Sequence, residues 1–158
     1  MSMPQHFQVV VIQWSSLLGG EIAGAATTLL RAPEQAFHPY IVAAATHGSC
    51  RLALSEALAS RGLILWRPVP PYFFDPRSVD LWLALDETAE SFARRRIEES
   101  GPAPRGFYRN VFPDPVQRLG TTIADPPGSE RLGEWLDELQ SVIEPWRERI
   151  WNVFYDSS

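Results

Sequence analysis

Apolar segments of strand length, separated by stretches with helical features, constrain the fold of this chain most strongly. Three segments rich in β-branched or other apolar side chains favour strands: 7–14, 38–46 and 63–69. Residues 17–32 lie between the first two and favour a helix, although three glycines weaken it. Residues 49–62 predict a short helix between Ser49, a good N-cap, and Gly62, a good C′ residue. Strand, helix and strand in succession indicate an α/β sheet with at least one parallel pair, although the alanines of 38–46 also permit a helix.

Residues 76–100 carry the clearest helix signals. Asp75 is a good N-cap, Pro76 suits the first helical position, and Gly101 followed by proline makes a stop. The stretch VDLWLALD within this range resembles a strand, but the caps at both ends favour one helix. Further on, 106–112 and 118–124 read as two short strands.

The last third of the chain predicts a long amphipathic helix over 130–155. Its apolar residues alternate at spacings of four and three, which makes a continuous seam: Leu132, Leu136, Leu139, Ile143, Trp146, Ile150 and Val153. Pro145 lies inside this helix and is expected to kink it or to split it in two.

These elements predict one α/β domain over 1–158, with a small mixed sheet of three to five strands and three or four helices. The apolar fraction of 45% is sufficient for a core. The chain has one cysteine, Cys50, so no intrachain disulfide can form and a reducing, cytoplasmic location is expected. No uncharged apolar run is long enough for a transmembrane helix, and MSMPQH lacks the basic residues of a secretory signal.

The charge of the chain is concentrated near its end. The net charge is −5, and residues 125–156 hold eight acidic side chains and three arginines, which accounts for all of it. Several acids follow helical spacing away from the apolar seam: Glu134, Asp137, Glu138, Glu144 and Glu148. This acidic helix face is either a solvated surface or a docking face for a basic protein, and it argues against nucleic acid and anionic membranes as partners.

The segment PVPPYFFDP, residues 68–76, places three aromatic side chains next to one another on a proline-rich path. The prolines favour an extended, stiff backbone. Phe73 and Phe74 are expected to plug the core, and Tyr72, with its polar tip, is expected to reach the surface. Because aromatic residues on stiff loops often anchor interfaces, Tyr72 and Phe73 join the acidic helix face as candidate partner-binding residues.

The stretch ATHGSCR, residues 45–51, is the strongest enzyme-like feature. It lies where a predicted strand ends and a helix begins, the position at which α/β sheets bind ligands. His47 would act as a base, Cys50 as a nucleophile, and Arg51 with the helix N-terminus as an anion site. The same residues also suit ordinary turn and cap chemistry. No motif for a cofactor and no ligand spacing for a metal is present.

On this basis the favoured hypothesis is a small cytoplasmic bacterial binding protein, either a toxin-neutralising immunity protein or an adaptor, which docks a basic protein partner through the acidic helix face; enzymatic activity is less favoured but stays open. The first alternative is a small transferase or hydrolase that uses His47, Cys50 and Arg51. The second is a homo-oligomeric structural protein, with a homodimer formed through the C-terminal helix.

Overall fold

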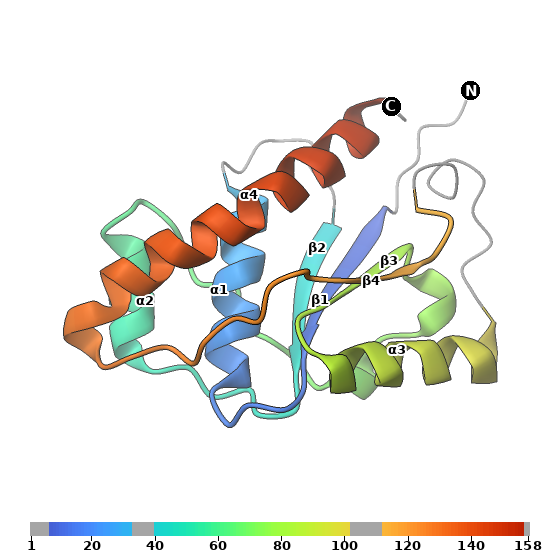
Figure 1. Cartoon of the computed structure of the whole chain (residues 1–158), viewed down its shortest axis with the longest axis horizontal. Helices are drawn as coiled ribbons and strands as arrows, with labels where there is room; N and C mark the ends of the chain where they lie inside the picture. The colour runs from blue at the N-terminus through green and yellow to red at the C-terminus, as the bar shows by residue number, and fades with distance from the viewer. Residues whose placement is uncertain (1–6, 33–39, 102–111, 157–158) are drawn as a thin grey trace.

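The computed structural model describes residues 7–32, 40–101 and 112–156 and shows an α/β fold built on a parallel sheet. The strands lie in the order β2-β1-β3-β4, and every neighbouring pair is parallel (Figure 1). Their bounds are β1 Gln8–Gln13, β2 Tyr40–Ala45, β3 Leu81–Ala84 and β4 Val116–Arg118. The predicted α/β class is confirmed, and the sheet is parallel throughout where a mixed one was expected.

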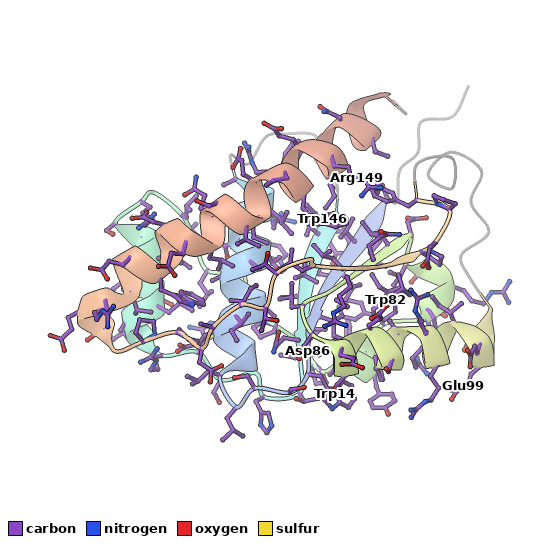
Figure 2. The ribbon with its side chains drawn as sticks, in the orientation of Figure 1. Trp14, Trp82, Asp86, Glu99, Trp146 and Arg149 are labelled. Atoms are coloured by element: carbon purple, nitrogen blue, oxygen red, sulfur yellow. The ribbon has the colours of Figure 1, made fainter. Side chains whose placement is uncertain are left out.

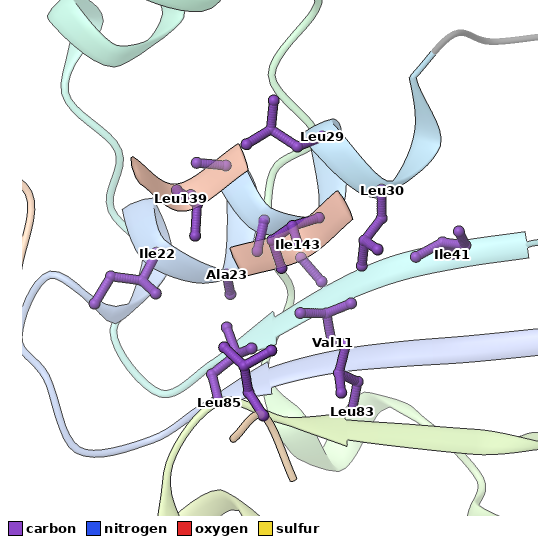
Figure 3. Close-up of a cluster of buried hydrophobic side chains, with 14 of the residues drawn as sticks. Val11, Ile22, Ala23, Leu29, Leu30, Ile41, Leu83, Leu85, Leu139 and Ile143 are labelled. Carbon is purple, nitrogen blue, oxygen red and sulfur yellow. The ribbon is translucent and has the colours of Figure 1, made fainter. Parts of the chain in front are cut away.

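Helices cover both faces of this sheet. Helices α1 (Gly19–Arg31), α2 (Leu52–Ala59) and α4 (Leu132–Asp156) pack together on one face, and α3 (Glu87–Ser100) packs on the other (Figure 1). Alternate residues of each strand supply the two cores. Val11 faces α1 and α4 (Figure 3), whereas Val10 faces α3. Strands buried on both faces are continuously apolar, which explains the run VVVI in β1.

Helix α1 is buried along its whole length, and its glycines allow this packing. A Cβ atom on Gly20 would lie 2.5 Å from the carbonyl oxygen of His47, and one on Gly24 would lie 3.0 Å from that of Trp66. The glycines that weaken the helix prediction are therefore the residues that let α1 approach its neighbours closely.

The single helix predicted for 76–100 is wrong in its first half. Asp75 caps only a short 3₁₀ turn, Pro76–Ser78, by accepting a hydrogen bond from the Arg77 amide. The stretch VDLWLALD contains β3, and α3 begins only after Asp86, whose side chain is the true N-cap. The predicted stop holds, because Gly101 ends the helix with φ of +83°. A short buried strand and a buried helix segment have the same apolar composition, so composition could not separate them. The prediction therefore relied on the caps Asp75 and Gly101, which do not bound a single helix.

The strand predicted for 63–69 is also wrong. In this segment a single bridge joins Val69 to Ala44, at the outer side of β2. Two prolines flank Val69, and a residue without an amide N–H cannot extend a ladder. The segment instead crosses beside α1, where the Trp66 amide donates to Thr28 Oγ1 at 2.8 Å.

Three smaller predictions also change. The N-cap of α2 is Arg51 and not Ser49, but Gly62 does follow the helix in a left-handed conformation, with φ of +76°. The predicted strand 106–112 lies almost entirely outside the described residues. In place of a strand over 118–124, β4 covers Val116–Arg118.

The predicted long C-terminal helix is confirmed, and it continues through Pro145 without being split. Its seam packs on α1 and the sheet, as Leu139 and Ile143 show in Figure 3. These contacts on both sides of Pro145 offset the loss of one helical hydrogen bond. The seam is buried in the core of the chain itself, and a homodimer formed through the C-terminal helix stays a prediction. None of the helices in the described ranges has the length and apolar character needed to cross a bilayer.

In the aromatic segment 68–76, the structure buries one of the two phenylalanines that were predicted to be buried. Phe74 is buried, but Phe73 is 73% exposed and Tyr72 is 68% exposed. Pro71–Phe73 forms a 3₁₀ turn, so the backbone is not extended there. The turn directs Phe74 into the core beside Val10 and Trp82, and it leaves Phe73 at the surface.

Phe74→Ala is expected to lower the free energy of unfolding by about 3 kcal/mol, because it removes a buried aromatic side chain. Phe73→Ala is expected to stay within about 0.5 kcal/mol of the wild type, since its ring is mostly in solvent. Urea unfolding followed by far-UV circular dichroism measures both, and equal losses for the two variants would contradict the burial described above.

Candidate functional site

The topology of the sheet places a candidate site at the carboxyl ends of β1 and β3. The chain leaves β1 for α1 on one face of the sheet and leaves β3 for α3 on the other. The two connecting loops therefore diverge and leave room between them, which is where ligands bind in open parallel sheets. Trp14 and Asp86 mark this edge in Figure 2.

The Asp86 carboxylate joins the two loops. One of its oxygens accepts hydrogen bonds from the backbone amides of Trp14, at 3.0 Å, and Ser15, at 2.8 Å. Its other oxygen accepts the amide of Ala89 at 2.7 Å and so caps α3. Ser15 Oγ adds a hydrogen bond to Thr88 Oγ1 at 3.1 Å. The Asp86 carboxylate and the Ser15–Thr88 hydrogen bond thus hold the loop after β1 to the start of α3.

A hydroxyl and a carboxylate meet at the same edge. Ser16 Oγ donates to Asp125 Oδ1 at 2.6 Å and accepts the Leu18 amide at 3.0 Å. Asp125 comes from the segment between β4 and α4, and it is exposed, while Ser16 is half-buried. A serine in this position can lose its proton to the carboxylate, so the pair has the geometry of a nucleophile and its base.

An ion pair lies beside this edge. Glu21, in the first turn of α1, is fully buried, and its carboxylate receives the Arg51 amide at 2.7 Å and the guanidinium nitrogens Nε and Nη2 at 2.8 Å each. These hydrogen bonds with Glu21 raise the pKa of Arg51 above its usual value. Arg51 Nη2 also donates to the Pro127 carbonyl at 2.9 Å. Arg51 therefore ties α1 and α2 to the segment that carries Asp125.

The loop after β2 packs against the loop after β1. Thr46 Oγ1 donates to the Trp14 carbonyl at 2.8 Å, and the close approach of Gly20 to His47 brings α1 to the same loop. The site predicted over 45–51 is thus next to the site that the topology indicates.

His47, Cys50 and Arg51 do not form one hydrogen-bonded group. His47 is exposed, and the structure gives it no hydrogen bond with Cys50 among the described residues. Cys50 Sγ lies 3.8 Å from the Gly48 carbonyl. Burial raises the pKa of the Cys50 thiol, against an opposing effect of Arg67. The reactive thiolate is therefore disfavoured at neutral pH.

The acids predicted to bind a partner lie along α4, and several have arginine partners in the chain itself. Asp137 pairs with Arg61 at 2.8 Å, and Glu144 pairs with Arg147 at 2.8 Å. Glu134 pairs with Arg131 at 3.4 Å. Glu138 and Glu148 are exposed on the same helix. These partners reduce the negative charge that the acidic helix face presents to solvent.

The prediction from sequence missed Ser15, Ser16 and Asp86, and it counted Asp125 among the acidic side chains of residues 125–156. A signal for Asp86 existed, because an aspartate before ETAESF is a good N-cap. A serine pair directly after a buried strand was the signal for Ser16.

No family model matches the chain, and no curated protein resembles it in sequence. Solved structures do resemble it. The YwlE arginine phosphatase from Geobacillus stearothermophilus has a TM-score of 0.67 and 17% identity over 96% of this chain and 97% of its own. The tyrosine phosphatase Wzb from Escherichia coli K30 has a TM-score of 0.56 and 19% identity over 90% of this chain and 96% of its own. A cysteine-to-serine mutant of YwlE with a phosphorylated active-site serine has a TM-score of 0.54 and 15% identity over 90% and 93%.

The chain has the fold of the small protein phosphatases. The predicted immunity protein or adaptor is wrong, because this fold, matched along almost the whole chain, is that of an arginine phosphatase and a tyrosine phosphatase. The alternative of a small transferase or hydrolase agrees better with the phosphatase fold. The sequence prediction failed because it took the lack of a recognisable motif as evidence for a binding protein.

Proposed function

We propose that the chain is a hydrolase that removes a phosphoryl group from its substrate at the Ser16–Asp125 pair. The observation that carries this proposal is the 2.6 Å hydrogen bond between Ser16 Oγ and Asp125 Oδ1 at the carboxyl edge of a parallel sheet. The phosphatase fold supports the choice of a phosphorylated substrate. The cytoplasm remains the predicted location, since a chain with one cysteine cannot form the intrachain disulfide that an oxidising compartment would allow.

The proposed reaction has two steps. In the first, Ser16 Oγ bonds to phosphorus while its proton passes to Asp125, the bond from phosphorus to the leaving group breaks, and Asp125 returns the proton to that group. In the second, water bonds to phosphorus, Asp125 accepts the water proton, and the bond to Ser16 Oγ breaks. Ser16 regains its proton, and inorganic phosphate leaves.

The raised pKa of the Cys50 thiol favours a serine as the nucleophile. The pKa of Cys50 is raised, so its thiol is a poor nucleophile near neutral pH. The YwlE mutant carries a phosphoryl group on an active-site serine, so a serine in the active site of this fold can hold the covalent intermediate that we propose.

Arg51 is the cation placed to offset the charge of the phosphoryl group. Its Nη2 is fixed to Pro127, two residues beyond Asp125, while its Nη1 donates to no described residue. A phosphoryl oxygen at this nitrogen would receive a charge-assisted hydrogen bond. Because Glu21 already neutralises much of this guanidinium, we expect phosphate binding to be weak and turnover to be slow.

The proposal is tested with p-nitrophenyl phosphate and with a phosphoarginine peptide as substrates of the full chain. We expect release of inorganic phosphate and, after acid quenching, a phosphoryl group that peptide mass spectrometry locates on Ser16. Cys50→Ser should keep the activity, and so should the matched control Ser141→Ala, whose hydroxyl contacts only its own helix. Loss of activity in Cys50→Ser, or no phosphate release by the wild type, would refute the proposal.

A further inference from the structure

The described residues line an open cavity of about 790 Å³ at the end of α1 opposite the Ser16–Asp125 pair. It lies between the last turn of α1, the turn after α2 and the middle of α4. Twelve residue steps along α1 separate Gly19 from Arg31, which corresponds to about 18 Å along the helix axis. The cavity is therefore separate from the proposed catalytic site, and its volume is within the range of small-molecule sites.

Three arginines from three different elements line this cavity: Arg31, Arg61 and Arg147. Arg31 is buried, with its guanidinium 3.8 Å from the centre of the Trp66 ring and Nη1 donating to the Ile41 carbonyl. Arg147 Nε donates to the Ala32 carbonyl. Arg61 Nη2 donates to the Gly133 carbonyl at 2.8 Å. Backbone and ring contacts thus fix all three guanidinium groups before any ligand arrives.

Two of these groups keep unused N–H donors. Arg61 Nε and Arg147 Nη2 have no hydrogen-bond acceptor among the described residues. Among the described lining residues Glu144 is the one acid, and it pairs with Arg147, whereas the Asp137 partner of Arg61 is 72% exposed, where solvent screens its charge. The lining therefore offers unused guanidinium donors suited to a planar or tetrahedral anion.

Part of the remaining lining is apolar. Leu29, Leu63 and Ile64 line the cavity, and Ile64 is 86% exposed. A large aliphatic side chain in solvent next to fixed cations gives the cavity one charged wall and one apolar wall. A ligand that matches both walls has an anionic head and a hydrocarbon body.

We propose that this cavity binds a small organic anion, a carboxylate or a phosphate joined to an apolar body. The proposal does not depend on the hydrolase activity, because it concerns the other end of α1 and its test measures binding.

Isothermal titration calorimetry with octanoate and with octyl phosphate tests it on the full chain. Octanol lacks the charge and acetate lacks the hydrocarbon body, so both should bind much more weakly than the two probes. Arg61→Gln should weaken binding of the better probe by at least about tenfold, because it removes a charged donor. The matched control Arg131→Gln removes an equal charge from an exposed arginine directly before α4 and should leave binding unchanged.

A second variant tests the proposal even if the Arg61→Gln protein does not fold. Ile64→Asp changes an exposed side chain, so it should fold normally and still weaken binding by placing a negative charge at the apolar wall. Octanol binding as tightly as octanoate, equal losses in Arg61→Gln and Arg131→Gln, or no binding of either probe to the wild type would overturn the proposal.

Discussion

Ser16→Ala and Asp125→Asn should each lower kcat/KM for phosphate release by about 10²–10⁴-fold. Each variant removes one member of a pair joined at 2.6 Å, and the asparagine keeps the shape of the side chain while losing the base. Because the two residues act as a unit, the double variant should lose little more than either single one. Initial rates with p-nitrophenyl phosphate for the four proteins measure this.

The matched control is Asp137→Asn, which removes the charge of another exposed aspartate, on α4. It should leave the rate unchanged. An active Asp125→Asn enzyme, or losses in the two single variants that multiply in the double variant, would show that Ser16 and Asp125 do not share one step.

Arg51→Met should lower the free energy of unfolding by about 3–5 kcal/mol, because it leaves the Glu21 carboxylate buried without its partner. Glu21→Gln should cost less, since the remaining Arg51 side chain is 41% exposed and can turn to water. Urea unfolding followed by tryptophan fluorescence at neutral pH gives both values.

Arg131→Met is the control, because this arginine belongs to an exposed pair that contributes little. If Arg51→Met were no more destabilising than Arg131→Met, the buried pair would not hold α1 and α2 together.

Local patterns predicted the elements whose own apolar pattern is strong, whereas the two clear caps of 76–100 gave the wrong element. The β-branched run of β1, the alanine-rich strand β2 and the seam of α4 are where their periodicity placed them. Local sequence could not show that the third strand is β3 and not residues 63–69. Both segments are short and apolar, and only the sheet itself shows that β3 pairs with β1 whereas the other segment passes the outer side of β2.

The candidate site was harder to predict because its residues are far apart in the chain. Ser16 and Asp125 are separated by 109 positions, and the Asp86 carboxylate reaches 71 positions back to the Ser15 amide. No spacing rule covers such distances. The loop 45–51 was found because a strand end followed by a cap is a local signal, and it proved to be next to the site.

The complete burial of α1 also has a consequence for how the chain acquires its structure. The helix has only 13 residues and three of them are glycines, so alone it is marginal in water. Its cover, α4, begins about 100 residues after α1 ends. During synthesis the ribosome must therefore release a long intervening stretch before α1 can be shielded, and until then its apolar side is open to chaperones and to other nascent chains.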